Sequence, residues 1–287
     1  MKILLLGSSG LLEKELKKIL KKKNEITNNG LRLRKKDLTS KENIQEMLSK
    51  KNYDLVINSV AITNLDYCEK NKKLSRQVNV GIVKDIFSIK KKFNLKFRFI
   101  QFSTDQVYNS SKGKLGKENF KKILLNEYTK QKVDAENICK SNNALIFRTN
   151  FFAYKKRSLF KWIIDSAYGK EKFLLFDDIY FNPLRINTIC NIINNIILNK
   201  KLNYQGIYNL GSRNVLSKSQ FGLEIIKKLK ISNSHHTITS SKKYFKAKRP
   251  SNMSMNVNKF IKKFQINLPK LENEIKDEVN KNVKDKN

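Results

Sequence analysis

Short apolar segments that alternate with longer amphipathic ones constrain the fold of this chain more than any other feature. The apolar segments are residues 3–6, 55–60, 97–102 and 144–147. Runs of this length are typical of strands that are buried on both faces of a parallel sheet. Between them, apolar residues recur at spacings of three and four among lysines and glutamates, in residues 11–20, 44–48, 74–89 and 128–139. This spacing indicates crossover helices, so the alternation predicts an α/β fold with a doubly wound parallel sheet.

The remaining segments are less regular. Residues 24–30 indicate a turn-rich break, and residues 31–34 a short strand. After Asn150 we expect a helix and a short strand within 155–179, an apolar helix over 186–198, a strand over 206–210, a helix over 217–229 capped by Ser217, and a charged helix from Leu271. The chain is therefore expected to contain a first domain in residues 1–150 and a smaller lobe in residues 151–287.

The charge of the chain is strongly positive. Lys and Arg together number 60 and Asp and Glu 25, which gives a formal net charge of +35. Such a charge attracts nucleic acids and anionic membranes. However, nucleic-acid readers concentrate arginines and aromatic residues on one element, whereas the basic residues here are mostly lysines scattered along the whole chain. We therefore expect no specific nucleic-acid partner, and a nucleic-acid binder is the weakest alternative.

The spacing of the cysteines and the shortness of the apolar runs exclude further classes of protein. Cys68, Cys139 and Cys190 are far apart and form no C-x-x-C pair, so neither a disulfide framework nor a zinc module is indicated. No segment approaches the roughly 18 apolar residues of a membrane span. We expect a cytoplasmic protein.

The segment Gly7-Ser8-Ser9-Gly10 follows the first predicted strand and opens the first predicted helix. Glycines at such a turn let the backbone approach a pyrophosphate, and the helix N-terminus offers N–H groups and a positive dipole end. A tight turn without a ligand is the alternative. Glu13 replaces the third glycine that this motif usually carries. We favour the ligand site and predict a Rossmann-like dinucleotide-binding domain in residues 1–150, with residues 151–287 mainly a substrate-binding lobe from which some segments return to the first domain.

A cationic segment follows the second predicted strand. Asp37 and Leu38 come where the adenine ring of a dinucleotide would lie, and Arg34 is one of four basic residues just before them. A basic side chain there accommodates the 2′-phosphate of NADP, whereas NAD is usually met by an acidic residue. The pattern favours NADP(H) over NAD(H), although the general excess of lysine would also produce it.

Tyr128 and Lys132 are four positions apart in a predicted helix, which places both side chains on one face. A free phenol has a pKa of about 10, and a nearby ammonium group favours its ionised form. Thr104 follows the apolar run 97–102, at the edge of the sheet where ligands bind, and its hydroxyl can donate to a carbonyl oxygen. Ser103 and Asp105 either join this site or cap the loop. The arrangement predicts a carbonyl-reducing site.

These motifs resemble those of the extended short-chain dehydrogenase/reductase superfamily and, within it, the dTDP-4-dehydrorhamnose reductase family. The resemblance runs nearly end to end. Besides the segments above, it includes residues 56–63, Val78-Asn79, 103–108, 126–132 with Glu136, 147–149, 206–210 and 249–252.

The resemblance implies a role for each matching residue. Gly7, Gly10, Leu11 and Leu12 would contact the pyrophosphate of the cofactor, Arg34, Asp37 and Leu38 its adenine side, and Ala61, Ile62 and Thr63 its backbone. Thr104, Tyr128 and Lys132 would be catalytic, with Tyr128 and Lys132 also on the cofactor; Thr104, Asp105, Tyr128 and Arg249 would bind substrate. The reaction implied is reduction of dTDP-4-dehydrorhamnose to dTDP-L-rhamnose by hydride transfer from NAD(P)H.

Other implications of the resemblance are less specific. It allows Mg²⁺ as a second cofactor, but we assign no metal ligands. It also leaves a homodimer open.

Two departures from the family pattern keep other functions open. Residues 178–184 differ from the usual loop sequence, and the proline that usually precedes the catalytic tyrosine is missing. The first alternative is therefore another nucleotide-sugar epimerase or reductase of surface polysaccharide synthesis. The second is a non-catalytic binding subunit that retains the cofactor fold, against which the presence of Tyr128 and Lys132 argues.

Overall fold

The computed structural model describes residues 1–7, 10–28, 39–156, 158–199, 203–244 and 248–282. These residues form two compact units. Unit 1 consists of residues 1–104, 124–148 and 190–208, and unit 2 of residues 105–123, 149–189 and 209–287. The segment 105–123 thus belongs to unit 2 although it precedes the boundary expected at 150, and 190–208 returns to unit 1. The assignment of cofactor binding to one part and substrate binding to the other stays a prediction.

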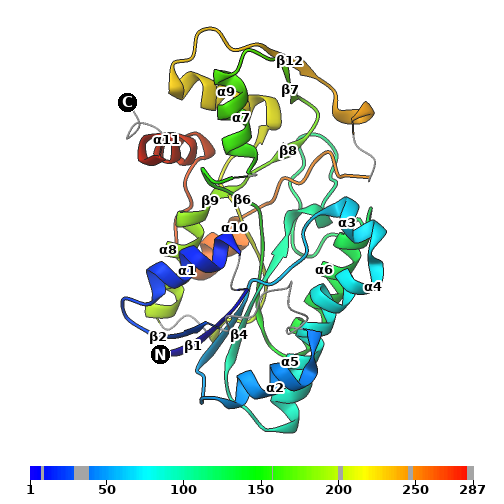
Figure 1. Ribbon diagram of the computed structural model, residues 1–287, viewed down its shortest axis with the longest axis vertical. Helices are drawn as coiled ribbons and strands as arrows, with labels where there is room; N and C mark the ends of the chain where they lie inside the picture. The colour runs from blue at the N-terminus through cyan, green and yellow to red at the C-terminus, as the bar shows by residue number, and fades with distance from the viewer. Residues whose placement is uncertain (8–9, 29–38, 157, 200–202, 245–247, 283–287) are drawn as a thin grey trace. The chain divides into compact units, whose positions relative to one another are not determined.

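A six-stranded sheet with the order β10-β5-β4-β3-β1-β2 organises unit 1 (Figure 1). Its strands are β1 (Lys2–Leu6), β2 (Glu25–Asn28), β3 (Leu55–Asn58), β4 (Arg98–Thr104), β5 (Leu145–Thr149) and β10 (Gly206–Leu210), the last of which continues into unit 2. β1 pairs in parallel with both β2 and β3, and β3 pairs in parallel with β4. The strand order reverses between β1 and β3, which is where open α/β sheets bind ligands. The predicted Rossmann-like fold is confirmed.

Helices cover both faces of this sheet (Figure 1). One face packs against α2 (Lys41–Ser49), α5 (Ile82–Lys92) and α6 (Glu127–Ser141), whose buried side chains share one apolar cluster with those of β1, β3, β4 and β5. α3 (Leu65–Lys70) and α4 (Lys72–Arg76) lie beside α6, while α1 (Leu11–Leu20) covers the opposite face. The crossover helices predicted from the apolar spacing are therefore present.

Two local predictions in unit 1 need correction. The segment predicted as a break contains β2, an edge strand with the sequence EITN; such a strand needs only one partly buried face, so it has no apolar run to reveal it. The single helix predicted over 74–89 is divided into α4, a π-helical turn η3 (Gln77–Gly81) and α5. The strand predicted over 31–34 lies outside the described residues.

Unit 2 contains pairs of short strands and five α-helices or parts of α-helices among its described residues. The strands are β6 (Phe151–Phe152), β7 (Phe173–Phe176), β8 (Tyr180–Phe181), β9 (Leu184–Arg185), β11 (Leu216–Ser217) and β12 (His236–Thr239). The helices are α7 (Leu159–Tyr168), α9 (Lys218–Leu229), α10 (Asn258–Phe264), α11 (Leu271–Asn282) and the start of α8 (Ile186–Leu198). α9 begins after Ser217, whose hydroxyl accepts from the backbone N–H of Gln220, as the predicted cap requires.

Phenylalanine side chains form the centre of unit 2. Phe221 lies 5.2 Å from Phe152, 6.2 Å from Phe160 and 5.4 Å from Phe181, measured between ring centroids. All four side chains are buried. This cluster joins α7 and α9 to the short strands β6 and β8.

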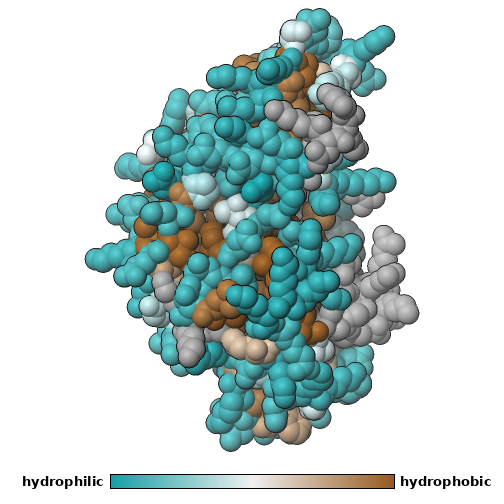
Figure 2. All heavy atoms as spheres, turned by 90° about the vertical axis from the view of Figure 1, so that its left-hand side faces the viewer, coloured by the Kyte–Doolittle hydropathy of each residue, from teal (hydrophilic) through white to brown (hydrophobic). Residues whose placement is uncertain are grey.

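The surface is mainly polar, as the composition requires. Hydrophilic residues cover most of the face shown in Figure 2, and hydrophobic atoms reach it in patches. Among the described residues, no helix is long and apolar enough to cross a bilayer.

We expect Phe221→Ala to lower the free energy of unfolding by about 3–5 kcal/mol, because it leaves a cavity among three aromatic rings. Denaturant unfolding followed by fluorescence measures this change. Tyr168→Ala is the control, since Tyr168 on α7 is 59% exposed and its loss should change stability by less than about 0.5 kcal/mol. Equal losses in the two variants would contradict this account of the core.

Candidate active site

The turn between β1 and α1 is shaped by two glycines. Gly7 has φ of 120°, a conformation that side chains rarely adopt, and a Cβ atom there would lie 2.6 Å from Ser59 Oγ. The Gly10 N–H donates to the Gly7 carbonyl at 2.9 Å, and Gly10 occupies the N-cap of α1, where it has no side chain to cap the helix. The backbone is therefore close to β3 and presents the start of a helix, which suits an anionic group. Ser8 and Ser9 lie outside the described residues.

The next two predicted residues behave differently. Leu11 is exposed and Leu12 is buried in the core, so Leu12 can contact a ligand at this turn only through its backbone. Glu13 is also buried, and burial raises the pKa of its carboxyl group, while Lys17 and Lys14 oppose that shift. Its carboxylate is therefore held inside the protein.

A second loop, after β3, carries Ala61, Ile62 and Thr63. Ser59 at its start donates from its hydroxyl to the Leu6 carbonyl at the end of β1. Further on, the Ile62 N–H donates to Asn79 Oδ1 at 2.8 Å and the Asn79 amide donates back to the Ile62 carbonyl at 3.0 Å. The loop is thus fixed at Ser59 and at Ile62, while Thr63 is exposed.

Asn79 and Gln131 are site residues that the sequence did not single out by role. The Asn79 amide also donates to Gln131 Oε1 at 2.8 Å, and the Gln131 amide donates to Ser75 Oγ at 2.8 Å. These bonds join the 61–63 loop to α6, next to Lys132. Asn79 lies in the π-helical turn, a feature common at functional sites. The sequence offered one signal for these two residues: both are polar at positions where the helical spacing predicts a buried side chain.

Tyr128 and Lys132 lie one turn apart on α6, and Thr104 ends β4. α6 begins at Asn126, which forms a capping box with Thr129 and so fixes the start of the helix directly before Tyr128. Thr104, Tyr128 and Lys132 are 4%, 6% and 4% exposed. The Lys132 ammonium group donates to the Phe102 carbonyl at 2.7 Å, which joins the helix that carries Tyr128 to the strand that carries Thr104.

The pKa of Lys132 is strongly perturbed. Burial lowers the pKa of its ammonium group to about 8, and the negative charge of Glu136 opposes this shift. The group can therefore lose its proton near physiological pH, unlike an exposed lysine. A buried ammonium one helical turn from a phenol is suited to proton transfer at a carbonyl oxygen.

The other predicted substrate residues, Asp105 and Arg249, belong to unit 2. Asp105 is buried, begins a short 3-10 helix (η4, Asp105–Val107), and accepts a hydrogen bond from Asn150 at 2.8 Å. Lys218, at the start of α9, interacts electrostatically with Arg249 and Asp105; burial lowers its pKa, and Arg249 lowers it further. The sequence did not indicate this additional cation.

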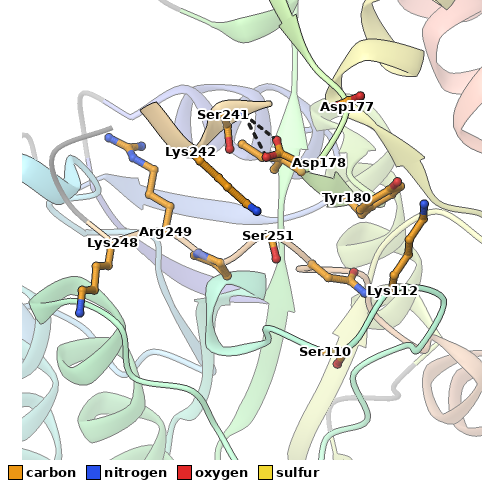
Figure 3. A pocket seen from close by; sticks show the side chains of 13 residues that line it. Ser110, Lys112, Asp177, Asp178, Tyr180, Ser241, Lys242, Lys248, Arg249 and Ser251 are labelled. Atoms are coloured by element: carbon orange, nitrogen blue, oxygen red, sulfur yellow. Dashed lines mark hydrogen bonds between the residues drawn. The ribbon is translucent and has the colours of Figure 1, made fainter. Parts of the chain in front are cut away.

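Arg249 lines a cavity of about 540 Å³ in unit 2. Lysines 112, 242 and 248 also line it, with Tyr180 and the two carboxylates Asp177 and Asp178 (Figure 3). Desolvation opposes ionisation of Asp178, but hydrogen bonds from Ser240 and Ser241 outweigh it and lower its pKa. Asp178 thereby holds the segment that begins η6 (Ser241–Lys243), from which Lys242 enters the cavity wall (Figure 3).

Three predicted cofactor residues cannot be placed. Arg34, Asp37 and Leu38 all fall within 29–38, outside the described residues. Among the residues that are described, no three His, Cys, Asp or Glu side chains gather in a way that could hold a metal ion.

Comparison with known proteins identifies the family. The RmlD substrate binding domain family matches residues 1–283. The chain belongs to this family. The sequence motifs predicted a resemblance to the dTDP-4-dehydrorhamnose reductase family, and this match confirms that prediction.

Solved structures agree in fold. A dTDP-4-dehydrorhamnose reductase ortholog from Clostridium acetobutylicum superposes with a TM-score of 0.87 at 22% identity, covering 98% of this chain and 99% of that one. The dTDP-4-dehydrorhamnose reductase of Bacillus anthracis, in complex with NADP, gives 0.88 at 18% identity, with coverage of 98% and 99%. At such identities the likeness shows the fold.

A curated relative is the probable low-salt glycan biosynthesis reductase Agl14 of Haloferax volcanii. It is 25% identical over 198 residues, which make up 66% of this chain. The match spans 64% of the length of that relative.

The perturbed ammonium group gives a pH-dependent prediction. Between pH 8 and 10.5 the unfolded chain still holds the Lys132 proton that the folded protein has released, so folding becomes more favourable as pH rises. The free energy of unfolding of the wild type should therefore rise, relative to that of Lys132→Met, by about 1.4 kcal/mol per pH unit within this window. Urea unfolding at a series of pH values measures the difference.

Lys130→Met is the matched control on the same helix. Lys130 pairs with Glu127, which raises its pKa, so it stays protonated across the window. If the free energies of unfolding of wild type and Lys132→Met change in parallel with pH, the pKa of Lys132 is not lowered by folding.

Proposed function

We propose that the protein is an NADPH-dependent reductase of a nucleotide-activated 4-keto-6-deoxysugar, with dTDP-4-dehydrorhamnose as substrate and dTDP-L-rhamnose as product. The observation that carries the proposal is the Tyr128 and Lys132 pair on α6, tied through the Phe102 carbonyl to the strand that ends in Thr104. Family membership over residues 1–283 supports it.

The residues at the carboxyl edge of unit 1 fit a dinucleotide. A side chain at Gly7 would clash with Ser59, so glycine lets the backbone of this turn lie against the loop after β3, where a pyrophosphate can approach it. Gly7, Gly10 and the backbone of Leu11 and Leu12 would hold that group, and Ala61, Ile62 and Thr63 would line its path toward the nicotinamide. When bound, NADPH supplies the hydride that adds to the C4 carbon of the sugar.

The chain's own side chains would supply the proton that the reduced carbonyl oxygen takes up. The Tyr128 hydroxyl donates its proton to the C4 oxygen as negative charge develops there, and the Thr104 hydroxyl donates a hydrogen bond to the same oxygen. The Lys132 ammonium group would stabilise the phenolate that remains and would help to hold the nicotinamide ribose. The buried position of all three side chains strengthens these electrostatic interactions.

The cavity in unit 2 suits the nucleotide diphosphate. Four cations (Lys112, Lys242, Lys248 and Arg249) against two carboxylates (Asp177 and Asp178) leave an excess of two positive charges, 4 − 2, in its wall. An arginine guanidinium binds phosphate oxygens in a planar fork, and Tyr180 offers an aromatic ring for a base. We therefore propose that Arg249 contacts the diphosphate.

The altered loop motivates the alternative of another sugar reductase or an epimerase. Within it, Phe181 and Leu184 are buried and Phe181 packs on Phe221 in the core, whereas Asp178, Ile179 and Tyr180 line the cavity. The departures thus change both packing and three positions that would meet the proposed ligand. Net consumption of NADPH separates a reductase from an epimerase, because an epimerase returns its hydride to the substrate, and a panel of sugars separates one reductase from another.

The remaining proposals concern setting and partners. The three cysteines are buried and free, which suits the cytoplasm proposed as the site of the reaction. A homodimer and Mg²⁺ dependence stay predictions.

We expect Tyr128→Phe to lower kcat about 10²–10⁴-fold, since it removes the proton donor and little else. Its Kd for NADPH should stay within about twofold of wild type, because the ring is retained. The measurement is NADPH absorbance with a panel of 4-keto nucleotide sugars, with Tyr168→Phe as the surface control. Full activity in Tyr128→Phe would refute the assignment of the proton donor, and no turnover by the wild type with any sugar would refute the function.

We expect Arg249→Ala to raise KM for the nucleotide sugar about 10- to 100-fold with kcat nearly unchanged, because a charged hydrogen bond of about 1.5–3 kcal/mol is lost from uniform binding. Arg213→Ala, at an exposed arginine of the same unit, is the control. An unchanged KM in Arg249→Ala would exclude this cavity as the diphosphate site.

A further inference from the structure

Unit 1 contains a fully buried ion pair beside the proposed catalytic lysine. Arg148 on β5 donates from Nε to Glu136 Oε1 at 2.8 Å and from Nη2 to Glu136 Oε2 at 2.7 Å. Both side chains are 0% exposed. The Ser103 hydroxyl donates to the same carboxylate, at 2.6 Å from Oε1. Three elements, β4, β5 and α6, therefore meet at one carboxylate.

Stability alone does not explain such a pair. Removing two charges from water costs about as much as their attraction returns, so apolar residues of similar size often do as well or better. A buried pair of this kind is therefore weak evidence for a stabilising role. Its position suggests what else it does.

Glu136 adjoins both halves of the proposed catalytic site. It lies four residues after Lys132, one turn along the same face of α6. Its hydrogen-bond partner Ser103 stands in β4 between Phe102, whose carbonyl accepts from Lys132, and Thr104. The carboxylate is thus linked to the proposed proton-transfer groups from the helix and from the strand.

We propose that Glu136, fixed by Arg148, is a positioning residue that keeps Lys132 as an ammonium group and holds the end of β4 in place for the reduction. The inference rests on the proposed function, in which the Lys132 ammonium binds the nicotinamide ribose and stabilises the Tyr128 phenolate.

The charges around Lys132 support this role. Burial lowers the pKa of Lys132, and Glu136 is the first group to raise it. Cys139, the next group on α6, stays neutral because burial raises the pKa of its thiol to about 12. The Glu136 charge therefore favours the protonated form of Lys132.

Groups from the neighbouring elements act elsewhere on α6. Glu69 of α3 accepts from the Glu127 N–H, and Arg76 of α4 pairs with Asp134 at 2.7 Å. The η3 turn contributes the neutral Asn79, and β5 contributes Arg148, which bonds Glu136 itself. The remaining titratable group near Lys132 on its own helix is the Tyr128 phenol.

The test is the pH dependence of NADPH binding by the full chain, followed by nicotinamide fluorescence from about pH 6 to 10. Glu136→Gln keeps an acceptor oxygen for Ser103 and Arg148 but removes the charge. Loss of a nearby opposite charge lowers a lysine pKa by about one unit or more. Affinity in the wild type should fall as pH rises through the pKa of Lys132, and in Glu136→Gln this fall should occur about one pH unit lower.

Three variants control the experiment. Asp134→Asn removes a carboxylate from the same helix that pairs with Arg76, and its pH profile should coincide with that of the wild type. Glu136→Asp retains the charge and should restore the profile toward wild type. Because Glu136→Gln leaves Arg148 without its ionic partner, the double variant Glu136→Gln, Arg148→Met keeps the test available if the single variant fails to fold, and a smaller shift in the same direction is expected, since the Arg148 charge is removed as well.

Coincident pH profiles of wild type and Glu136→Gln would overturn the proposal, and so would a loss of affinity that is equal at every pH, which a purely structural role predicts. Failure of the proposed function looks different: the wild type then reduces no 4-keto sugar or binds no NADPH. If the wild type binds no NADPH, the pKa of Lys132 can still be measured from stability. The difference in free energy of unfolding between the chain with Lys132 and its Lys132→Met variant is followed against pH, once with Glu136 and once with Glu136→Gln. If this difference changes over the same pH range in both cases, the role of Glu136 is refuted.

Discussion

The hydrogen bond from the Lys132 ammonium group to the Phe102 carbonyl is the interaction on which the proposed site depends. It places a charged group in the interior of unit 1 and ties the helix that carries Tyr128 to the strand that ends in Thr104. Burying an ammonium group is costly unless it is hydrogen bonded and paired. The Phe102 carbonyl supplies the hydrogen bond and Glu136 the opposite charge, so the position of Lys132 determines what the surrounding polar residues must be.

Two polar networks extend from this helix in different directions. Through Gln131 and Asn79, α6 is joined to the 61–63 loop, which is itself fixed to the end of β1 by Ser59. Through Glu136 it is joined to β4 and β5. Glutamine 131 and glutamate 136 thus connect the proposed proton-transfer helix with the proposed cofactor loop on one side and with the strand of Thr104 on the other. Rigid supports of this kind hold reacting groups within the small tolerances that catalysis requires.

Sequence patterns revealed those parts of the molecule that follow a local rule. Strands buried on both faces and amphipathic crossover helices have periodicities of their own, so the sheet of unit 1 and most of its helices were predictable. The edge strand β2 has no apolar run, and the π-helical turn inside residues 74–89 keeps the apolar spacing of a continuous helix. Neither leaves a distinct local pattern.

The supporting polar contacts were not predictable for a different reason. Ser103 and Glu136 are separated by 33 residues and Asn79 and Gln131 by 52, so each partner appears in the sequence without the other. The Tyr128 and Lys132 pair was visible because its spacing is that of one helical turn. Glu136 has the same spacing from Lys132, but only the fold shows that Arg148 and Ser103 meet it. A resemblance to a family could include Glu136 without giving its role.

The distribution of arginine shows where the lysine-rich composition meets a physical limit. The chain has 60 basic residues, most of them lysines, and these account for its charge without marking a site. Arg148, by contrast, makes two parallel bonds to Glu136 in a fully buried position, which the single ammonium group of a lysine cannot do. Arg76 pairs with Asp134, and Arg249 lines the cationic cavity. At Arg148 the contact depends on a planar fork of donors, so this arginine indicates a structural role that the net charge does not.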